Sequence, residues 1–225
     1  MTPKEQIQNH INNNYHNSYS VLQSVESSIK ERKFHQQIHI LYDLVEFLDK
    51  EEIYYIEIGS YVGTSANLVL SNNKVKKVIC IDPLNLSKSH FCGALEQEQT
   101  LKNNLAKFDS KRYSIMKGFS TDQEIINNFT NKTGCFDLLF IDGDHSYQGV
   151  LDDFNNYEHC VRRGGFIVFD DYFDHRHSPD VKKSVDYLCS LESVKKKYDI
   201  IGTVKAKLSQ KLQRDYGEFI LRKKQ

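Results

Sequence analysis

The sequence predicts an α/β fold, in which a doubly wound and mostly parallel sheet is closed by an antiparallel strand and preceded by an N-terminal helical extension. Three observations predict it. Short apolar runs alternate with helical stretches between residues 53 and 221, as in right-handed βαβ units. The runs are continuous rather than alternating, which is typical of strands covered on both faces. The chain has 225 residues, enough to bury a core as a single domain.

The N-terminal region is expected to stand apart from the rest of the fold. Residues 1–20 are rich in Asn, His and Tyr and show no helical period, so we expect a loose or partner-stabilised segment there. A helix is predicted for residues 21–29. In residues 38–48 apolar side chains recur at helical spacing, which predicts an amphipathic helix. We therefore divide the chain into a helical arm, residues 1–34, and one domain, residues 35–225.

The elements of the domain follow from its apolar runs and from the residues that end them. Strands are predicted at residues 53–58, 78–81, 113–116, 136–141 and 166–169. Helices are predicted at residues 65–70, 95–107, 121–129, 147–161 and 180–191. Two further strands, at residues 198–204 and 216–221, are predicted to close the sheet.

Composition and charge argue against several classes of protein. Lys and Arg number 30 and balance 30 Asp and Glu, and a chain without a basic surplus is not expected to bind nucleic acid or a membrane surface through its charge. The first 20 residues are polar, and no apolar run approaches the roughly 18 residues of a membrane span. The five cysteines include no C-x-x-C pair, as expected of reduced thiols. We expect a cytoplasmic protein and leave homo-oligomerisation open.

Acidic residues follow the predicted strands at the points where the strands end. The carboxyl edge of an open α/β sheet is where ligands bind. A single acid in such a place is more often a helix N-cap, but five of them, each after an apolar run, favour a site. The five are Glu57, Asp82, Asp142, Asp170 and Asp171.

A glycine-containing turn follows the first strand. It reads E-I-G-S-Y-V-G-T-S from Glu57 to Ser65, and its glycines allow backbone to approach a ligand closely. It is neither a G-x-G-x-x-G dinucleotide turn nor a phosphate-binding loop with Lys. Asp82 lies 23 residues after Gly59, at the end of the second strand, where an acid can accept both hydroxyls of a ribose. Together the turn and Asp82 predict a cofactor that contains a nucleoside.

These motifs resemble those of class I S-adenosylmethionine-dependent methyltransferases, which have a Rossmann-like sheet. The turn is similar to E-L-G-A-Y-C-G-Y-S of the metal-dependent catechol type, and residues 118–121 are similar to its G-A-S-Q. Residues 136–172, with I-D-G-D-H-S-Y and G-G-F-I-V-F-D-D-Y, resemble the small bacterial sugar and antibiotic O-methyltransferases. The resemblance covers about residues 35–175 and does not extend clearly over residues 1–34 or 176–225.

The resemblance implies a role for each matching residue. Gly59 and Gly63 would line the methionine moiety within a turn that includes Ser60 and Tyr61, Ser65 would hold its carboxylate, and Glu57 would support the turn and the amino group. Asp82 would hold the ribose, Ser120 beside Phe119 would border the adenine, and Asp142 would border both cofactor and metal. The family implies one divalent cation, held by Asp142, Asp170 and Asp171.

The metal site is also supported by chemistry. Three carboxylates at adjacent strand ends repel one another unless a cation lies between them, and oxygen ligands favour a hard ion such as Mg²⁺. Asp171 stands where the catechol type has Asn, and it could instead cap the next loop. His145, three residues after Asp142, has an ordinary pKa suited to a general base, although it could instead bond the backbone of its turn.

Other polar residues near these motifs are expected to be less important. Asp144 and Tyr147 are interpreted as turn and helix-start residues, and His175 and His177 as solvated. The doublet Asp152–Asp153 is expected on a solvated helix face.

The predicted function is a Mg²⁺- and S-adenosylmethionine-dependent O-methyltransferase acting on a hydroxyl of a small molecule. The chain has no Trp, which catechol-type sites use against adenine and substrate, and this favours a sugar or polyketide hydroxyl over a catechol. Two alternatives remain: another metal-dependent or nucleotide-cofactor enzyme on the same fold, and a non-catalytic nucleoside-binding protein.

Overall fold

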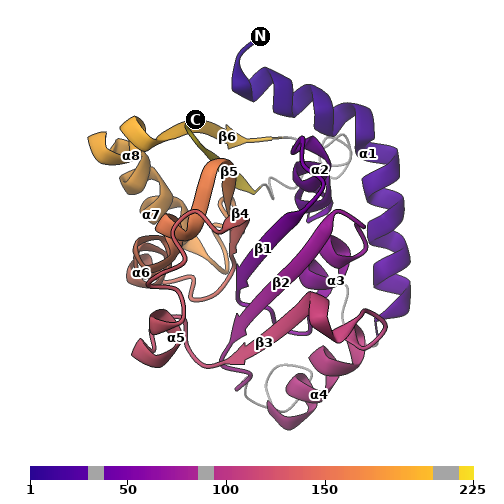
Figure 1. Cartoon of the computed structure of the whole chain (residues 1–225). Coiled ribbons are helices and arrows are strands. Elements are labelled where there is room, and N and C mark those ends of the chain that lie inside the picture. Colours follow the sequence, from indigo (N-terminus) through magenta and orange to yellow (C-terminus); the bar gives the residue numbers. More distant parts are fainter. Residues whose placement is uncertain (30–37, 86–93, 205–217) are drawn as a thin grey trace.

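A computed structural model describes residues 1–29, 38–85, 94–204 and 218–225 of the chain (Figure 1). One seven-stranded sheet has the strand order β3-β2-β1-β4-β5-β7-β6. The first five strands along the chain are parallel, whereas β7 runs antiparallel to both β5 and β6. The predicted fold class is therefore confirmed. The strands are β1 Ile53–Ile58, β2 Val75–Asp82, β3 Tyr113–Lys117, β4 Phe136–Ile141, β5 Val161–Phe169, β6 Tyr198–Thr203 and β7 Phe219–Lys223.

Helices cover both faces of the sheet, as the continuous apolar strands predict. Those described are α1 Pro3–Ser28, α2 His39–Phe47, α3 Thr64–Leu70, α4 Ala94–Leu105, α5 Gln123–Asn127, α6 Tyr147–Tyr157, α7 Pro179–Ser190 and α8 Glu192–Lys197, with short 3₁₀ turns at residues 110–112 and 158–160. None of them, within the described ranges, is long and apolar enough to cross a bilayer.

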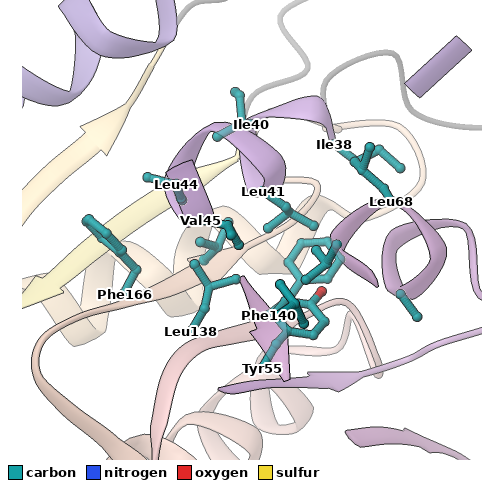
Figure 2. Close-up of a cluster of buried hydrophobic side chains, with 14 of the residues drawn as sticks. Ile38, Ile40, Leu41, Leu44, Val45, Tyr55, Leu68, Leu138, Phe140 and Phe166 are labelled. Atoms are coloured by element: carbon teal, nitrogen blue, oxygen red, sulfur yellow. The ribbon is translucent and has the colours of Figure 1, made fainter. Parts of the chain in front are cut away.

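The core consists of two apolar layers, one on each face of the sheet, because successive side chains of a strand point to opposite faces. In β4, Leu138 and Phe140 pack under α2, whereas Leu139 and Ile141 pack under α6 and α7. Figure 2 shows the first layer, in which side chains of α2 lie over Tyr55, Leu138 and Phe166. The two layers hold the strands in place and so fix the relative positions of the strand ends.

The N-terminal segment differs from its prediction. Residues 1–20 are not loose: α1 is one 26-residue helix, opened by a capping box between Thr2 and Glu5. Ile7, Ile11 and Leu22 are fully buried against the first apolar layer. The buried apolar residues of α1 form a narrow stripe among residues of low helix propensity. Packing of this stripe, rather than helix propensity, therefore stabilises the helix. The helical extension is confirmed, and the boundary at residue 34 falls outside the described residues.

The observed bounds of two strands differ from the predicted ones. β5 begins at Val161 rather than at residue 166, and it runs through Gly164 and Gly165. A Cβ on Gly165 would lie 2.6 Å from the carbonyl oxygen of Asp137, so this glycine lets β5 approach β4 closely. The closing strand β7 begins at Phe219, and residues 216–217 of its predicted span lie outside the described residues.

The sheet has its switch point between β1 and β4. The chain leaves β1 toward β2 and β3 on one side, and it leaves β4 toward β5 on the other. The backbone N–H of Asp142 donates to the carbonyl of Ile58 (2.9 Å), and that of Asp170 donates to Ile141 (3.1 Å). The residues that follow β1, β4 and β5 therefore lie next to one another, at the edge where such sheets bind ligands.

Candidate functional site

The glycine turn after β1 is pressed against the end of β4. Gly59 has φ +87°, and a Cβ on it would lie 1.8 Å from the carbonyl oxygen of Asp142. Gly63 has φ +80° at the start of α3, and a Cβ there would lie 2.5 Å from Leu101 Cδ1. Both glycines are thus required by backbone conformation and by close packing. Their contact with a methionine moiety stays a prediction.

Glu57, in β1, stabilises the glycine turn through a buried hydrogen bond to Ser65. It is fully buried and accepts hydrogen bonds from the hydroxyls of Tyr55 and Ser65, both at 2.8 Å. Burial raises the pKa of the Glu57 carboxyl, although these hydrogen bonds oppose the rise. Ser65 Oγ donates its single hydrogen to Glu57, so this hydroxyl must rotate before it can donate to a cofactor carboxylate, the contact that the family resemblance implies for it.

Asp82 joins the turn to β2. Its carboxylate accepts from the backbone N–H of Tyr61 (2.8 Å) and of Leu84 (2.7 Å), and from Gln97 Nε2 (3.2 Å). Burial raises its pKa, and the three hydrogen bonds lower it. A carboxylate has about four acceptor positions, so one remains for a ligand. Gln97 was not predicted, because nothing in a helical pattern indicates which polar residue faces a neighbouring strand.

The remaining residue of the turn, Ser60, is 2% exposed, and its carbonyl accepts from the N–H of Gly63 at 2.7 Å. Tyr61 has a positive φ of 48°. The N–H of Tyr61 donates to the Asp82 carboxylate, so the turn is held by a side chain of β2 as well as by its own backbone hydrogen bond. The cofactor contacts predicted for Ser60 and Tyr61 stay predictions.

Ser120 is held by α6. Its Oγ donates to Asp153 Oδ1 (2.5 Å), and its carbonyl accepts from the hydroxyl of Tyr157 (2.7 Å). The expectation of a solvated Asp153 is wrong, since the side chain is 1% exposed and lies one helical turn before Tyr157 on the same face. Burial raises the pKa of Asp153 to about 7; the Ser120 hydrogen bond opposes the rise, and the charges of Asp144 and Asp152 add to it.

The segment around Ser120 presents an aromatic side chain. Phe119 is 52% exposed directly before Ser120. An exposed ring beside a residue predicted to border adenine is suited to stacking on a base. The predicted adenine contact of Ser120 itself stays a prediction.

Asp142, His145 and Asp171 form a cluster at the ends of β4 and β5. Each offers one ligand atom, and these atoms all lie within 4.8 Å of one another. Asp170, the other predicted ligand, is buried beside this group and is not one of its three members. The structure therefore brings together two of the three predicted carboxylates and adds the imidazole. We call these three residues the Asp142 cluster.

The two ring nitrogens of His145 make different contacts. Nε2 lies 3.2 Å from Asp142 Oδ1, and Nδ1 lies 2.8 Å from Ser178 Oγ, which in turn donates to Asp171 Oδ2 at 2.7 Å. Burial lowers the pKa of His145, but the Asp142 hydrogen bond and the charges of Asp142, Asp171 and Asp170 outweigh it and raise the pKa to about 9.

Ser178 was missed by sequence reasoning. It is 2% exposed and lies directly before α7, in the part of the chain that the resemblance does not cover. Its N–H donates to the carbonyl of Asp174 (3.0 Å), so a tight turn after β5 returns it to the Asp142 cluster. The only signal in the sequence is a serine before a proline-initiated helix, which is typical of an N-cap.

The neighbouring polar residues behave as expected. Asp144 accepts from the N–H and the hydroxyl of Ser146, as a residue that shapes a helix start does. His177 is exposed and bonds Asp174 rather than the cluster, and His175 is also exposed.

The family of the chain follows from comparison with known proteins. A family model described as a methyltransferase domain matches residues 56–172, from β1 through the turn after β5. An uncharacterized protein of Acanthamoeba polyphaga mimivirus is 36% identical over 191 residues, which are 82% of this chain and 83% of that protein.

Solved structures share the fold at low identity. An O-methyltransferase from Bacillus cereus, in complex with SAH, has a TM-score of 0.58 and 17% identity, covering 90% of this chain and 89% of that one. A candidate caffeoyl-CoA O-methyltransferase from Staphylococcus aureus has a TM-score of 0.62 and 20% identity, covering 95% and 96%. An rRNA methylase from Streptococcus thermophilus has a TM-score of 0.57 and 12% identity, covering 86% and 100%. These likenesses concern the fold.

The matched region contains the glycine turn, Asp82, the Ser120 segment and the Asp142 cluster. The strand order and the two covered faces agree with the same assignment. The chain belongs to the methyltransferase domain family and is a class I S-adenosylmethionine-dependent methyltransferase.

Proposed function

We propose that this protein is a divalent-metal-dependent O-methyltransferase that transfers the methyl group of S-adenosylmethionine to a hydroxyl of a small molecule, with a sugar hydroxyl favoured. One observation carries the proposal. The glycine turn and the Asp142 cluster are in direct backbone contact, because Gly59 has no room for even a Cβ beside the Asp142 carbonyl. A methyl donor held by the turn would thus lie next to a hydroxyl held at the cluster.

The donor set fits a divalent cation. Two carboxylates and an imidazole converge, and a third carboxylate, that of Asp170, adds its negative charge nearby. Such oxygen and nitrogen donors are ordinary ligands of divalent ions. When bound, a cation there would chelate neighbouring hydroxyls and lower the pKa of one of them. Asp142 and Asp171 are the residues that would hold it, with Asp170 as the predicted third.

The chain's own residues supply positioning. Asp82 and Glu57 keep the glycine turn in one conformation through hydrogen bonds, and Asp153 and Tyr157 do the same for the Ser120 segment. A rigid donor site beside a rigid acceptor site lowers the entropy cost of bringing the reacting atoms together. The general-base role of His145 stays a prediction, since both of its ring nitrogens are engaged in these contacts.

The charge of the chain supports a small substrate over RNA. Lys and Arg equal Asp and Glu in number, and phosphate-backbone binding depends on a local excess of cations. The sequence has no Trp, which catechol-type sites use against adenine and substrate, and this supports a sugar over a catechol as the substrate.

The test is methyl transfer from isotope-labelled S-adenosylmethionine to a panel of sugars, nucleotide sugars and catechols. We expect turnover that EDTA abolishes and added divalent metal restores. Asp142→Ala should abolish it too, whereas Asp152→Ala, on the solvent side of α6, should leave it unchanged. Transfer that survives both EDTA and Asp142→Ala would contradict the metal-dependent function.

A further inference from the structure

We propose that a groove between the start of α1 and the strand β6 binds an extended, acidic segment of a partner protein, which pairs with β6 as an added strand. The groove has a volume of about 330 Å³ and lies between residues 2–4 and residues 198–201. Figure 1 shows the start of α1 beside β6. Thr203, at the other end of β6, is level with Phe219 and so with Phe169 at the carboxyl end of β5. The groove thus lies toward the opposite edge of the sheet from the Asp142 cluster.

The outer edge of β6 has no neighbouring strand in the described part of the chain, because β6 is the last strand in the order of the sheet. On its inner edge, the N–H of Lys224 donates to the carbonyl of Lys197 at 2.8 Å, and Asp199 is paired with Arg222. Along an antiparallel ladder, hydrogen-bonded residues alternate with residues whose N–H and C=O groups face away from the partner strand. Lys197 and Asp199 are of the first kind, so Ile200 directs its backbone N–H to the outer edge.

Two backbone groups on this outer edge are placed to receive another strand. The N–H of Tyr198 donates to the carbonyl of Val194 in α8, which leaves the Tyr198 carbonyl and the Ile200 N–H for a partner. One residue of a parallel partner strand can bond both groups, since it donates its N–H to the first and accepts from the second through its carbonyl. Ile200 is also 42% exposed, and its side chain offers an apolar contact to the partner.

The charge of the groove is positive. Its lining contains three lysines, Lys4, Lys195 and Lys224, and one acid, Asp199. Asp199 lies 4.0 Å from Lys224, whereas Lys195 is paired with Glu192 at 2.9 Å on the surface. Exposed ion pairs contribute little to stability, so Lys195 can exchange Glu192 for a carboxylate of the partner at low cost. The positive end of the 26-residue helix α1 forms part of the same lining and adds to the attraction for an anion.

Charge and edge together favour one occupant. A second copy of this chain would bring an identical set of lysines against the first, and such repulsion is a usual means by which edge strands avoid pairing with themselves. A nucleic-acid strand would satisfy the lysines but has no backbone amides to pair with Tyr198 and Ile200. An acidic peptide in extended conformation satisfies both, as in other cases of strand addition to an exposed sheet edge.

The experiment titrates the full chain with a fluorescent peptide of alternating Glu and Val residues, and with a matched peptide of alternating Lys and Val. Fluorescence anisotropy gives the two affinities, and we expect the acidic peptide to bind at least about tenfold more tightly, because several lysines act together. Hydrogen exchange of the Ile200 amide should slow when the acidic peptide saturates the chain. An acidic peptide whose backbone is N-methylated at alternate residues should not slow it, since it cannot pair with β6.

Two sets of variants separate the charge from the edge. Lys4→Glu combined with Lys195→Glu should weaken binding of the acidic peptide by about tenfold or more, whereas Lys76→Glu, which changes an exposed lysine of β2 outside the groove, should bind as the wild type does. Ile200→Pro removes the N–H at an outer edge, where proline is tolerated, and should abolish binding; Ile200→Val keeps the N–H and should retain it. Binding of S-adenosylhomocysteine, measured alongside, reports that each variant is folded.

Four outcomes would overturn the proposal. Equal affinity for the acidic and basic peptides, or an equal loss in Lys76→Glu and in the groove variant, would remove the role of the lysines. Unchanged exchange of the Ile200 amide at saturating acidic peptide would exclude strand addition. A dimer of the free chain in sedimentation, dissociated by Ile200→Pro, would assign the edge to a second copy instead. Tighter binding of a single-stranded RNA than of the acidic peptide, lost in the groove variant, would assign the lysines to nucleic acid.

Discussion

Gly59 and the carbonyl oxygen of Asp142 are so close that a Cβ on Gly59 would lie 1.8 Å from that oxygen. The two residues directly follow the neighbouring strands β1 and β4, on either side of the switch point of the sheet. Neither atom of the contact belongs to a flexible side chain, so the glycine turn and the Asp142 cluster cannot move independently. The first prediction follows from this contact.

Gly59→Ala should lower the free energy of unfolding by more than about 2 kcal/mol, because it adds a backbone clash to a strained φ. Urea denaturation measures the change. Gly134→Ala is the control: Gly134 also has a positive φ, of 64°, but its Cβ would lie 3.8 Å from the nearest atom, Arg162 Cα. Gly134→Ala therefore reports the conformational cost alone. Equal losses in the two variants would show that the contact with Asp142 is relaxed.

Asp82→Ala should weaken S-adenosylhomocysteine binding about tenfold or more. The carboxylate both orders the N–H groups of Tyr61 and Leu84 and keeps one acceptor position for the ribose, and hydrogen bonds to charged groups contribute about 1.5–3 kcal/mol. Calorimetry measures the affinity. Asp109→Ala, which removes an exposed acid that caps a 3₁₀ turn, should bind as the wild type does. An unchanged affinity in Asp82→Ala would exclude the ribose contact.

Asp142→Ala should remove divalent metal binding and leave S-adenosylhomocysteine affinity within a few-fold of wild type. The side chain of Asp142 faces His145, whereas its backbone contacts the glycine turn. Truncating the side chain therefore removes a ligand from the Asp142 cluster and leaves the glycine turn unchanged. Parallel titrations with Mn²⁺ and with S-adenosylhomocysteine separate the two effects. If Asp142→Ala lost affinity for both, the Asp142 side chain would contribute to cofactor binding as well as to metal binding.

Stability should fall as pH rises from about 4 to 8, in part because of Asp43. This carboxyl of α2 is fully buried against α1. Burial raises its pKa to about 8; the hydrogen bond from Ser18 (3.0 Å) opposes this rise, and the negative charge of Glu46 adds to it. In the unfolded chain its pKa is about 3.9. Between these values only the folded state holds the proton, so this group lowers stability by up to about 1.4 kcal/mol for each pH unit.

Asp43→Asn removes that titration, so the variant should gain stability relative to wild type as pH rises from 5 to 8. Urea unfolding at pH 5, 6.5 and 8 measures the difference, in which the other groups cancel. Asp49→Asn, which changes an exposed carboxyl, should follow the wild-type profile. Parallel curves for Asp43→Asn and wild type would show that Asp43 is ionised in the folded protein.

Local patterns were sufficient for the sheet and for most of the site. Continuous apolar runs predicted the parallel strands, because a strand buried on both faces has no polar side. The acids at the strand ends were predicted to gather at one edge, since parallel strands end on the same side, and Asp142 and Asp171 do converge there. The family resemblance added the cofactor, which neither spacing nor composition identifies by itself.

Other features depended on contacts between segments far apart in the chain. Asp153 was expected in solvent because a charged doublet on a helix is usually exposed. The side chain is buried instead, where it accepts a hydrogen bond from the hydroxyl of Ser120, 33 residues earlier in the chain. Residues 1–20 were expected to be loose because they are rich in Asn, His and Tyr and show no helical period. In the structure Ile7 and Ile11 pack on a hydrophobic layer that the rest of the chain builds.

What the sequence by itself determined is therefore the order of the elements, the edge of the sheet that carries the site and the acids at that edge, since periodicity and strand direction are local properties. Only the tertiary structure decided that His145 joins Asp142 and Asp171, and that Ser178 holds them. Ser178 lies 33 residues from His145 along the chain, and the direction in which a hydroxyl hydrogen points depends on acceptors that folding alone brings within reach.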